Sequence, residues 1–505
     1  MFESAEMGHA IDKAKYARRV SRLREELLAT QFAVLERAKF PVVVLLNGVE
    51  GAGRSETASL LSAWMDSRHV ITNGFNEQSD EERARPPMWR FWRAMPPKGS
   101  VGLFFGSWYT DPIVGRVFQT MKRGEYEDYL DRIVNLEQML CDEGVTLVKL
   151  WFHLSKEQQK KRLAALEKDE ETRWRVTKRD WEYFGLYDRF RSVSEAVVRR
   201  TSTGHAPWHI IEGTDARYRS LTSATLLLDA MKASLAARDA PAAKPKATPA
   251  ITTTPVTLEF DHKNLVNTID LSQKLAKAKY HRELERLQGA LNLLSRHKRI
   301  REIGVVTVFE GADAAGKGGA IRRLTQAIDV RYCHVVPIAA PTDEERAQPY
   351  LWRFWRHMPR KGRLTVFDRS WYGRVLVERV EGFCTEVDWR RAYAEINDFE
   401  EQLVSSGLVV CKFWLQISRE EQLRRFKERE KIGFKQYKLT KDDWRNRKKQ
   451  DAYEIAAAEM IDRTSIERAP WTLVAAEDKY HARIHVMQTL VDRLERALAR
   501  SHDSP

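Results

Sequence analysis

The apolar positions of this chain fall into two patterns that alternate along its second half. Short apolar runs, which are typical of buried strands, occur at residues 303–309, 334–338, 364–367, 409–415 and 471–475. Between them, apolar residues recur at helical spacing, as in the basic segment that contains Leu284, Leu287, Leu291 and Leu294. Strands that alternate with helices predict a parallel sheet covered on both faces and connected by right-handed crossovers. We therefore expect an α/β fold built as a three-layer α/β/α domain.

The first half shows the same pattern, with its first strand predicted at residues 42–46, because the chain repeats itself. Three motifs recur at an offset of 263 residues (352 minus 89): Trp-Arg-Phe-Trp-Arg at 89 and 352, Ser-Trp-Tyr at 107 and 370, and Ala-Pro-Trp at 206 and 469. A tandem duplication is the interpretation that accounts for this regularity. It predicts two domains, at residues 1–235 and 258–505, joined by an extended linker rich in Pro, Ala and Thr at residues 236–257.

Composition narrows the class of protein. Hydrophobic residues make up 43% of the chain and charged residues 31%, which is typical of a soluble globular protein. There is no apolar run of about 18 residues, residues 1–19 lack the apolar segment typical of a secretory signal, and the four cysteines form no C-x-x-C pair, so we expect no secretory signal and a cytoplasmic location. The net charge of +14 favours a polyanionic partner such as nucleic acid, an anionic membrane or a phosphate polymer, although it also fits a solubilising surface.

A glycine-rich turn in the second half has the spacing of a phosphate-binding loop. The sequence from Gly311 to Gly318 reads G-A-D-A-A-G-K-G, and it follows a predicted strand and opens a predicted helix. Backbone N–H groups of such a turn and the helix N-terminus attract an anion, and Lys317 can reach its oxygens. The predicted phosphate-binding residues are Gly311, Ala314, Ala315, Gly316, Lys317, Gly318 and Gly319.

Two carboxylates are candidates for a metal site beside this loop. The Ser or Thr that usually follows the lysine and helps to hold Mg²⁺ is replaced by Gly318. The metal would therefore need other oxygens, and Asp313 in the loop and Asp368 at the end of a predicted strand can supply them. A turn or capping role is the alternative for Asp368. We predict a Mg²⁺ site at Asp313 and Asp368.

Four motifs together resemble the polyphosphate kinase 2 family. They are the loop 311–319, Pro-Thr-Asp-Glu-Glu at 341–345, Tyr-Leu-Trp-Arg-Phe-Trp at 350–355, and Phe-Asp-Arg-Ser-Trp-Tyr-Gly-Arg at 367–374. The tandem arrangement with one degenerate copy is similar to the class II members of that family. The resemblance covers nearly the whole chain. It implies tandem kinase-like P-loop domains with helical lids, and transfer of a phosphoryl group from inorganic polyphosphate to AMP with Mg²⁺.

The resemblance also implies roles for individual residues. Asp313 would orient or deprotonate the acceptor phosphate and help to hold the metal, Lys317 would bind the transferring phosphate, and Asp368 would bind Mg²⁺. Arg369 and Arg374 would clamp phosphates, and the planar guanidinium suits such bidentate binding. The predicted catalytic residues are Asp313, Lys317, Asp368, Arg369 and Arg374.

A basic segment follows the fourth strand of the second half. Ser418 is a plausible N-cap for a helix at 419–430, and a second helix is expected near Trp444. A linear polyphosphate needs a long cationic track, whereas a solvated helix surface is the alternative for any single residue. The predicted track residues are Arg424, Lys427, Lys435, Lys438 and Arg445. The aromatic motif that includes Trp352 and Phe354 is interpreted as core.

The first copy has lost the chemistry-bearing residues. At the same offset, Asp313, Lys317, Asp368, Arg369 and Arg374 are replaced by Glu50, Arg54, Phe105, Gly106 and Asp111. We expect the first copy to fold without catalysing. Other functions stay open: ADP as the acceptor, an ATP-dependent nucleoside monophosphate kinase, and a polyanion-binding module without turnover. The expected partners are polyphosphate and AMP, with neither nucleic acid nor a membrane, and a homo-oligomer is compatible with the sequence.

Overall fold

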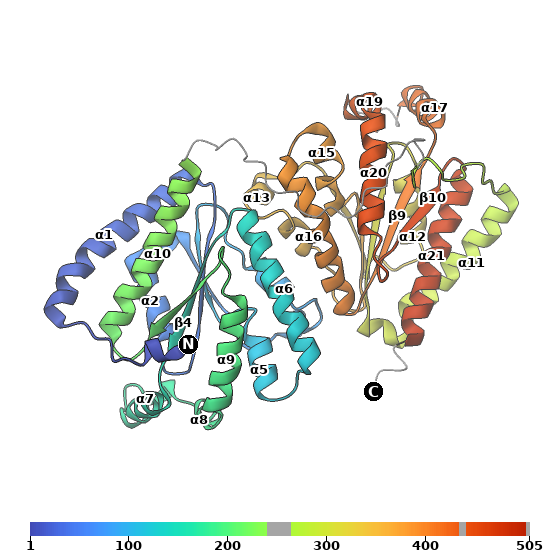
Figure 1. Cartoon of the computed structure of the whole chain (residues 1–505). Coiled ribbons are helices and arrows are strands. Elements are labelled where there is room, and N and C mark those ends of the chain that lie inside the picture. Colours follow the sequence, from blue (N-terminus) through green and yellow to red (C-terminus); the bar gives the residue numbers. More distant parts are fainter. Residues whose placement is uncertain (240–263, 434–440, 501–505) are drawn as a thin grey trace. The chain divides into compact units, whose positions relative to one another are not determined.

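The computed structural model describes residues 1–239, 264–433 and 441–500. It divides into two compact units (Figure 1). Unit 1 takes in most of the first repeat together with residues 341–353, and unit 2 takes in most of the second repeat together with residues 79–89. Most of the predicted linker at 236–257 lies outside the described residues. No helix within them is long and apolar enough to cross a membrane.

Each repeat contains a five-stranded parallel sheet, so the predicted fold class is confirmed. The strand orders are β2-β3-β1-β4-β5 and β7-β8-β6-β9-β10, so corresponding strands occupy corresponding places. In the first repeat the strands are β1 (Val42–Gly48), β2 (Val70–Gly74), β3 (Val101–Phe105), β4 (Thr146–His153) and β5 (Trp208–Glu212). In the second they are β6 (Gly304–Gly311), β7 (Cys333–Pro337), β8 (Leu364–Asp368), β9 (Leu408–Gln416) and β10 (Trp471–Ala475).

Helices cover both faces of the second sheet, as Figure 1 shows. The amphipathic helix α11 (Lys277–Arg296) lies beside α21 (Lys479–Arg500), and Leu287 and Leu291 are buried in the core beneath them. α12 (Lys317–Thr325) begins at the glycine-rich turn. The other helices described in the second repeat are α13 (Asp343–Arg346), α14 (Trp352–Trp355), α15 (Val377–Glu381), α16 (Glu386–Ser405), α17 (Arg419–Glu430), α19 (Lys441–Lys448) and α20 (Gln450–Thr464), with 3-10 turns η4 (Lys298–Glu302) and η5 (Trp371–Arg374).

The first repeat has the matching set of helices. α1 (Lys13–Arg37) and α10 (Ala216–Asp239) lie side by side on one face of its sheet, like α11 and α21 (Figure 1). The others are α2 (Arg54–Trp64), α3 (Asp80–Arg83), α4 (Trp89–Arg93), α5 (Thr110–Val117), α6 (Arg123–Asp142), α7 (Lys156–Lys168), α8 (Lys178–Gly185) and α9 (Tyr187–Thr201), with η1 (Phe2–Ala5), η2 (Ser67–His69) and η3 (Arg173–Arg175).

The aromatic motif is core, as the sequence predicts. Trp352, Phe354 and Trp355 are all less than 9% exposed. Phe354 packs edge-on against Trp371 at a ring-centroid distance of 5.9 Å. The first repeat makes the equivalent contact between Phe91 and Trp108 at 5.7 Å. Because both repeats keep this packing, the motif serves the fold.

A buried ion pair fixes the turn that follows β8. The Lys412 Nζ on β9 donates to Glu400 on α16 at 2.6 Å and to the Thr464 carbonyl at 2.6 Å, and both charged side chains are fully buried. Glu400 also accepts from Trp371 Nε1 at 3.0 Å and Tyr372 Oη at 2.6 Å. The pair therefore ties β9, α16, α20 and η5 together at one point.

The first repeat contains the same network at the same offset. Lys149 donates to Glu137 at 2.6 Å and to the Thr201 carbonyl at 2.7 Å, and both charged side chains are fully buried. Glu137 accepts from Trp108 at 3.0 Å and from Tyr109 at 2.6 Å. The network therefore belongs to the architecture of both repeats.

We predict that Lys412→Met lowers the free energy of unfolding by about 3–5 kcal/mol, because it leaves the Glu400 charge buried without its partner. The matched Lys149→Met should destabilise by a similar amount, and Lys412→Met combined with Glu400→Gln should lose less than Lys412→Met alone. Differential scanning calorimetry measures these changes. An unchanged thermal midpoint for Lys412→Met would contradict the prediction.

Candidate active site

The glycine-rich turn connects β6 to α12 and requires two of its glycines. Gly311 has φ of 137°, and a Cβ built there would lie 2.2 Å from the Leu415 carbonyl oxygen of β9. Gly316, with φ of 112°, is the N-cap of α12. These positive φ angles favour residues without a side chain. The turn thus places the first N–H groups of α12 at the carboxyl end of the sheet, where an anion can bind them.

The predicted loop residues contact one another and the neighbouring strand end. The Lys317 Nζ donates to the Gly311 carbonyl at 2.7 Å, so the lysine folds over its own loop. Asp313 Oδ1 accepts from Arg369 Nη2 at 3.3 Å, and Asp313 Oδ2 accepts from Asn446 Nδ2 at 2.9 Å. The structure thereby brings Asp313 and Arg369 together from segments 56 positions apart.

Asp368 lies at the end of β8, directly beside the strand that feeds the loop. β6 and β8 run parallel with Phe309 opposite Asp368. Arg369 follows in the left-handed region with φ of 65°, a conformation that costs a non-glycine residue about 1–2 kcal/mol. Burial alone would lower the pKa of Arg369, but Asp313, Glu310 and Asp368 outweigh it and raise the pKa above its usual value. Four of the five predicted catalytic residues thus meet at one edge of the sheet.

The fifth, Arg374, is held at the end of η5. Its side chain is 12% exposed and its Nε pairs with Glu378 Oε2 at 2.8 Å. This ion pair connects η5 to α15. Arg374 therefore stands close to the strand-end turn in sequence, while its role in clamping phosphate stays a prediction.

The predicted polyphosphate track is only partly within the described residues. Arg424 of α17 pairs with Glu421 at 2.6 Å and with Glu428 at 3.4 Å, both on its own helix. Arg445 of α19 pairs with Glu381 at 3.2 Å. Lys427 is exposed. Lys435 and Lys438 lie outside the described residues, so the track stays a prediction.

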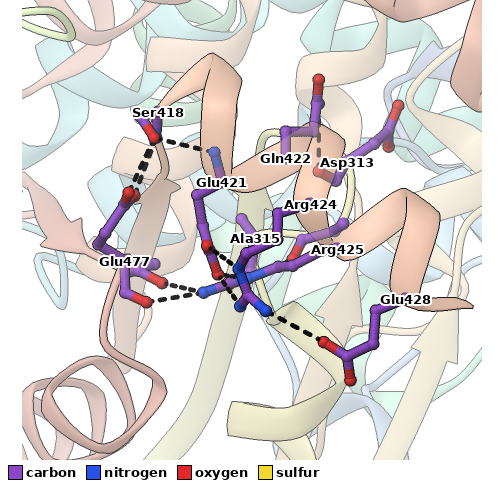
Figure 2. A network of polar contacts seen from close by, with 11 residues as sticks. Asp313, Ala315, Ser418, Glu421, Gln422, Arg424, Arg425, Glu428 and Glu477 are labelled. Carbon is purple, nitrogen blue, oxygen red and sulfur yellow. Dashed lines mark hydrogen bonds and ion pairs between the residues drawn. The ribbon is translucent and has the colours of Figure 1, made fainter.

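Arg425, next to the predicted Arg424, braces the loop from α17 (Figure 2). It is 4% exposed, and its guanidinium donates to the carbonyls of Ala314 at 3.0 Å and Ala315 at 3.1 Å. The same group donates to the carbonyls of Ala476 at 2.9 Å and Glu477 at 2.8 Å. One buried arginine therefore joins the phosphate-binding loop to the end of β10. The sequence predicts this arginine only as part of a basic helix and does not distinguish it from its neighbours.

A cavity of about 300 Å³ opens beside the loop. Small loop residues, Arg425 and Glu428 line it, together with four more cationic side chains from α12, α17 and the start of α21: Arg322, Arg429, Lys479 and Arg483. Arg429 falls in the basic helix predicted at 419–430, whereas Arg322, Lys479 and Arg483 are not among the predicted residues. A signal was present, because the residues at the same offset in the first repeat are all uncharged: Ser59, Leu166, Ala216 and Ser220.

In the first repeat, the substituted side chains satisfy one another. Arg54 forms an ion pair with Glu50 within the loop, and its guanidinium lies 5.2 Å from the centre of the Phe105 ring. Arg219, which replaces Ala482 of the cavity wall, packs against Gly53 and pairs with Glu56 at 3.2 Å. The cationic groups at this loop are therefore paired with carboxylates of the same repeat.

The geometry of the second repeat defines a class of protein domain. A lysine-bearing glycine loop, a helix N-terminus and a carboxylate on the adjacent strand end characterise P-loop domains that bind and transfer phosphoryl groups. Among the described residues, no three His, Cys, Asp or Glu side chains form a metal-binding group. The two carboxylates at the loop still suit an ion such as Mg²⁺, which keeps several waters and binds substrate phosphates.

Comparison with known proteins identifies the family. The profile of polyphosphate kinase 2 matches residues 10–239 and 274–502, so the chain belongs to the polyphosphate kinase 2 family. It is 53% identical to the polyphosphate:AMP phosphotransferase of Pseudomonas aeruginosa over 98% of this chain and 99% of that protein. Its identity to the Acinetobacter johnsonii protein of the same name is 35%, over 93% and 95% of the two chains. A crystal structure of a polyphosphate kinase 2 homologue from Pseudomonas aeruginosa superposes with a TM-score of 0.89 at 51% identity, covering 99% and 100% of the two chains.

We predict that Asp368→Asn lowers turnover by roughly 10²–10³-fold, because it removes charge from the strand end that faces the phosphate loop. The thermal midpoint should change little, since Asp368 is only partly buried. Phe105→Leu at the equivalent position of the first repeat is the control and should leave turnover unchanged. Substantial activity of the Asp368→Asn variant would contradict the assignment of the chemistry to the second repeat.

Proposed function

We propose that this chain transfers the terminal phosphoryl group of inorganic polyphosphate to AMP and forms ADP. The observation that carries the proposal is the cationic cavity at the phosphate loop of the second repeat, because four of its cations are replaced by uncharged residues in the first. The names of the full-length relatives, which are polyphosphate:AMP phosphotransferases, support the same donor and acceptor.

The cavity suits a donor that carries a charge on every unit. Arg322, Lys479 and Arg483 approach it from two helices, and the loop residues Gly316 and Gly319 form its inner wall. A phosphate chain placed there would run from the helix N-terminus into a cationic recess. A nucleotide donor would bring an uncharged base and sugar to the same recess, for which clustered cations offer no matching partners.

Phosphoryl transfer requires mainly that the two substrates are aligned and that positive charge surrounds the transferring group. An oxygen of the AMP phosphate forms a bond to the terminal phosphorus, the bond from that phosphorus to its bridging oxygen breaks, and the shortened polyphosphate leaves with the electron pair. Lys317 and the loop N–H groups bind the transferring group, while Arg369 and Arg374 balance charge on its oxygens. Asp313 orients the acceptor phosphate.

A divalent metal ion, Mg²⁺ in this proposal, would be held by Asp313 and Asp368 together with substrate oxygens and waters. When bound, it would neutralise phosphate charge and draw the two substrates together. Lys317, Arg369 and the N–H groups of the phosphate-binding loop supply the rest of the positive charge at the site.

The proposal predicts that purified protein with Mg²⁺ forms ADP only when AMP and polyphosphate are both present. Chromatography of the nucleotides after incubation with AMP, ADP or GMP in turn measures the acceptor preference. A chelator should abolish the reaction and added Mg²⁺ should restore it. ATP serving equally well as the donor would favour a nucleoside monophosphate kinase instead.

The cavity can be tested separately from the loop. Arg322→Ala and Arg483→Ala should each raise the KM for polyphosphate by roughly 10–100-fold, because each removes one charge-assisted phosphate contact worth about 1.5–3 kcal/mol. The KM for AMP should stay within twofold. Arg286→Ala, on the exposed face of α11, removes an equal charge away from the cavity and is the matched control. Equal effects of all three substitutions would contradict a defined polyphosphate path.

A further inference from the structure

A cluster of three arginines lies beside the loop of the first repeat and has no part in the mechanism above. Arg162 comes from α7, Arg175 from η3 and Arg219 from α10. Their guanidinium groups lie 2.8, 3.5 and 3.2 Å, respectively, from carboxylate oxygens of Glu56, in the first turn of α2. Within the described part of the chain, Glu56 is the one carboxylate that pairs with these arginines. Three positive charges thus share a single negative charge.

The duplication shows that this cluster occupies the side of the loop where the second repeat has its cavity. Two of the smallest residues that line the cavity are Gly319 and Ala482. At the same offset, the first repeat has Glu56 and Arg219. An ion pair therefore stands where the second repeat leaves room for a ligand.

The other two arginines keep cationic positions of the second repeat. Arg162 is equivalent to Arg425, and Arg175 is equivalent to Lys438 of the predicted polyphosphate track. Whereas Arg425 is 4% exposed, the side chains of Arg162 and Arg175 are 41% and 42% exposed. A dissolved anion can therefore reach both guanidinium groups.

The carboxylate leaves part of the cluster unsatisfied. Arg219 is 5% exposed, and its buried Nε has no hydrogen-bond partner among the residues that the structure describes. Glu56 supplies two oxygens and one negative charge, whereas a phosphate group supplies three oxygens and about two charges. The planar guanidinium also matches phosphate geometry. Because ion pairs between partly exposed side chains are weak, a phosphate can displace the carboxylate.

We propose that Arg162, Arg175 and Arg219 form a second phosphate-binding site, which binds a unit of the polyphosphate chain when the side chain of Glu56 moves away. Glu56 is then an internal competitor, and it lowers the apparent affinity by the fraction of molecules in which it occupies the site. The site would bind the polymer without transferring phosphate, because Phe105 stands where the second repeat has its strand-end carboxylate. The inference takes its ligand class from the proposed function, but it concerns binding alone.

Glu56→Gln tests the competition, because it keeps the size of the side chain and removes its charge. Titration of the full chain with tripolyphosphate, followed by calorimetry without AMP, should show two binding sites per chain in the wild type. In Glu56→Gln the weaker site should bind at least tenfold more tightly. Arg483→Ala, in the cavity of the second repeat, should weaken the other site and leave this one unchanged. Glu157→Gln removes a carboxylate from an exposed pair on α7 and is the matched control, which should leave both affinities unchanged.

The arginines are tested by the double substitution Arg162→Ala and Arg175→Ala, which should leave one tripolyphosphate per chain. The control is Arg22→Ala combined with Arg123→Ala, which removes the same charge from two exposed side chains of other helices. Equal losses in the two double variants would overturn the proposal, because they would indicate a general effect of net charge.

A gain in affinity cannot result from misfolding, so Glu56→Gln decides the question even where the double variant is unstable. An affinity of Glu56→Gln within twofold of the wild type would overturn the proposal. So would a single tripolyphosphate per chain in the wild type and in Glu56→Gln alike. Failure of the proposed function would appear separately, as a wild-type protein that forms no ADP from polyphosphate and AMP.

Discussion

The buried lysine–glutamate pair beneath the strand ends is the interaction on which the rest of each repeat depends. In the second repeat, Lys412 and Glu400 join the strand β9, the helices α16 and α20 and the turn after β8 within one hydrogen-bonded group. Removing one partner of a buried ion pair destabilises the protein far more than the pair itself stabilises it, because the other charge stays buried without compensation. The two charged residues therefore have to be kept or lost together. The turn that carries Arg369 is therefore held in place by the hydrogen bonds that Trp371 and Tyr372 donate to Glu400.

The duplicated chain separates the residues that build the fold from those that serve the reaction. The ion pair, the Ser-Trp-Tyr turn and the aromatic motif are present in both repeats with nearly the same contact distances. The loop lysine, the strand-end aspartate and four cations of the cavity (Arg322, Arg429, Lys479 and Arg483) are present only in the second. Because both repeats fold into the same sheet order, the second group is dispensable for folding. We propose that its members are retained in one repeat because they bind an anion.

Sequence patterns predicted the architecture well, because strands and caps are determined locally. Trp471–Ala475 and the Ser418-capped helix Arg419–Glu430 were predicted with their observed bounds. The loop and Asp368 were predicted to share one site, and parallel neighbouring strands bring them together. Arg425 was predicted only as one of several basic residues of a helix, and Arg483 was not predicted, because their importance comes from contacts between distant segments. A basic helix does not reveal which arginine turns inward to four carbonyl groups and which one pairs with glutamates on its own surface.

The left-handed backbone at the strand end, at Arg369 and Gly106, makes substitution easier in one direction than in the other. Exchanging the arginine there for glycine relieves conformational strain, so the loss of the arginine side chain is energetically downhill for the fold. The reverse exchange restores the strain and places a guanidinium beside Phe105, where the residue at the position of Asp313, Glu50, is already paired with Arg54. Arg54 and Glu50 form an ion pair, so replacing either one alone by the residue of the second repeat removes the partner of the other. The loss of catalysis that we expect in the first repeat would thus be hard to reverse, because single substitutions lead away from the residues of the second repeat and only several coordinated substitutions lead back.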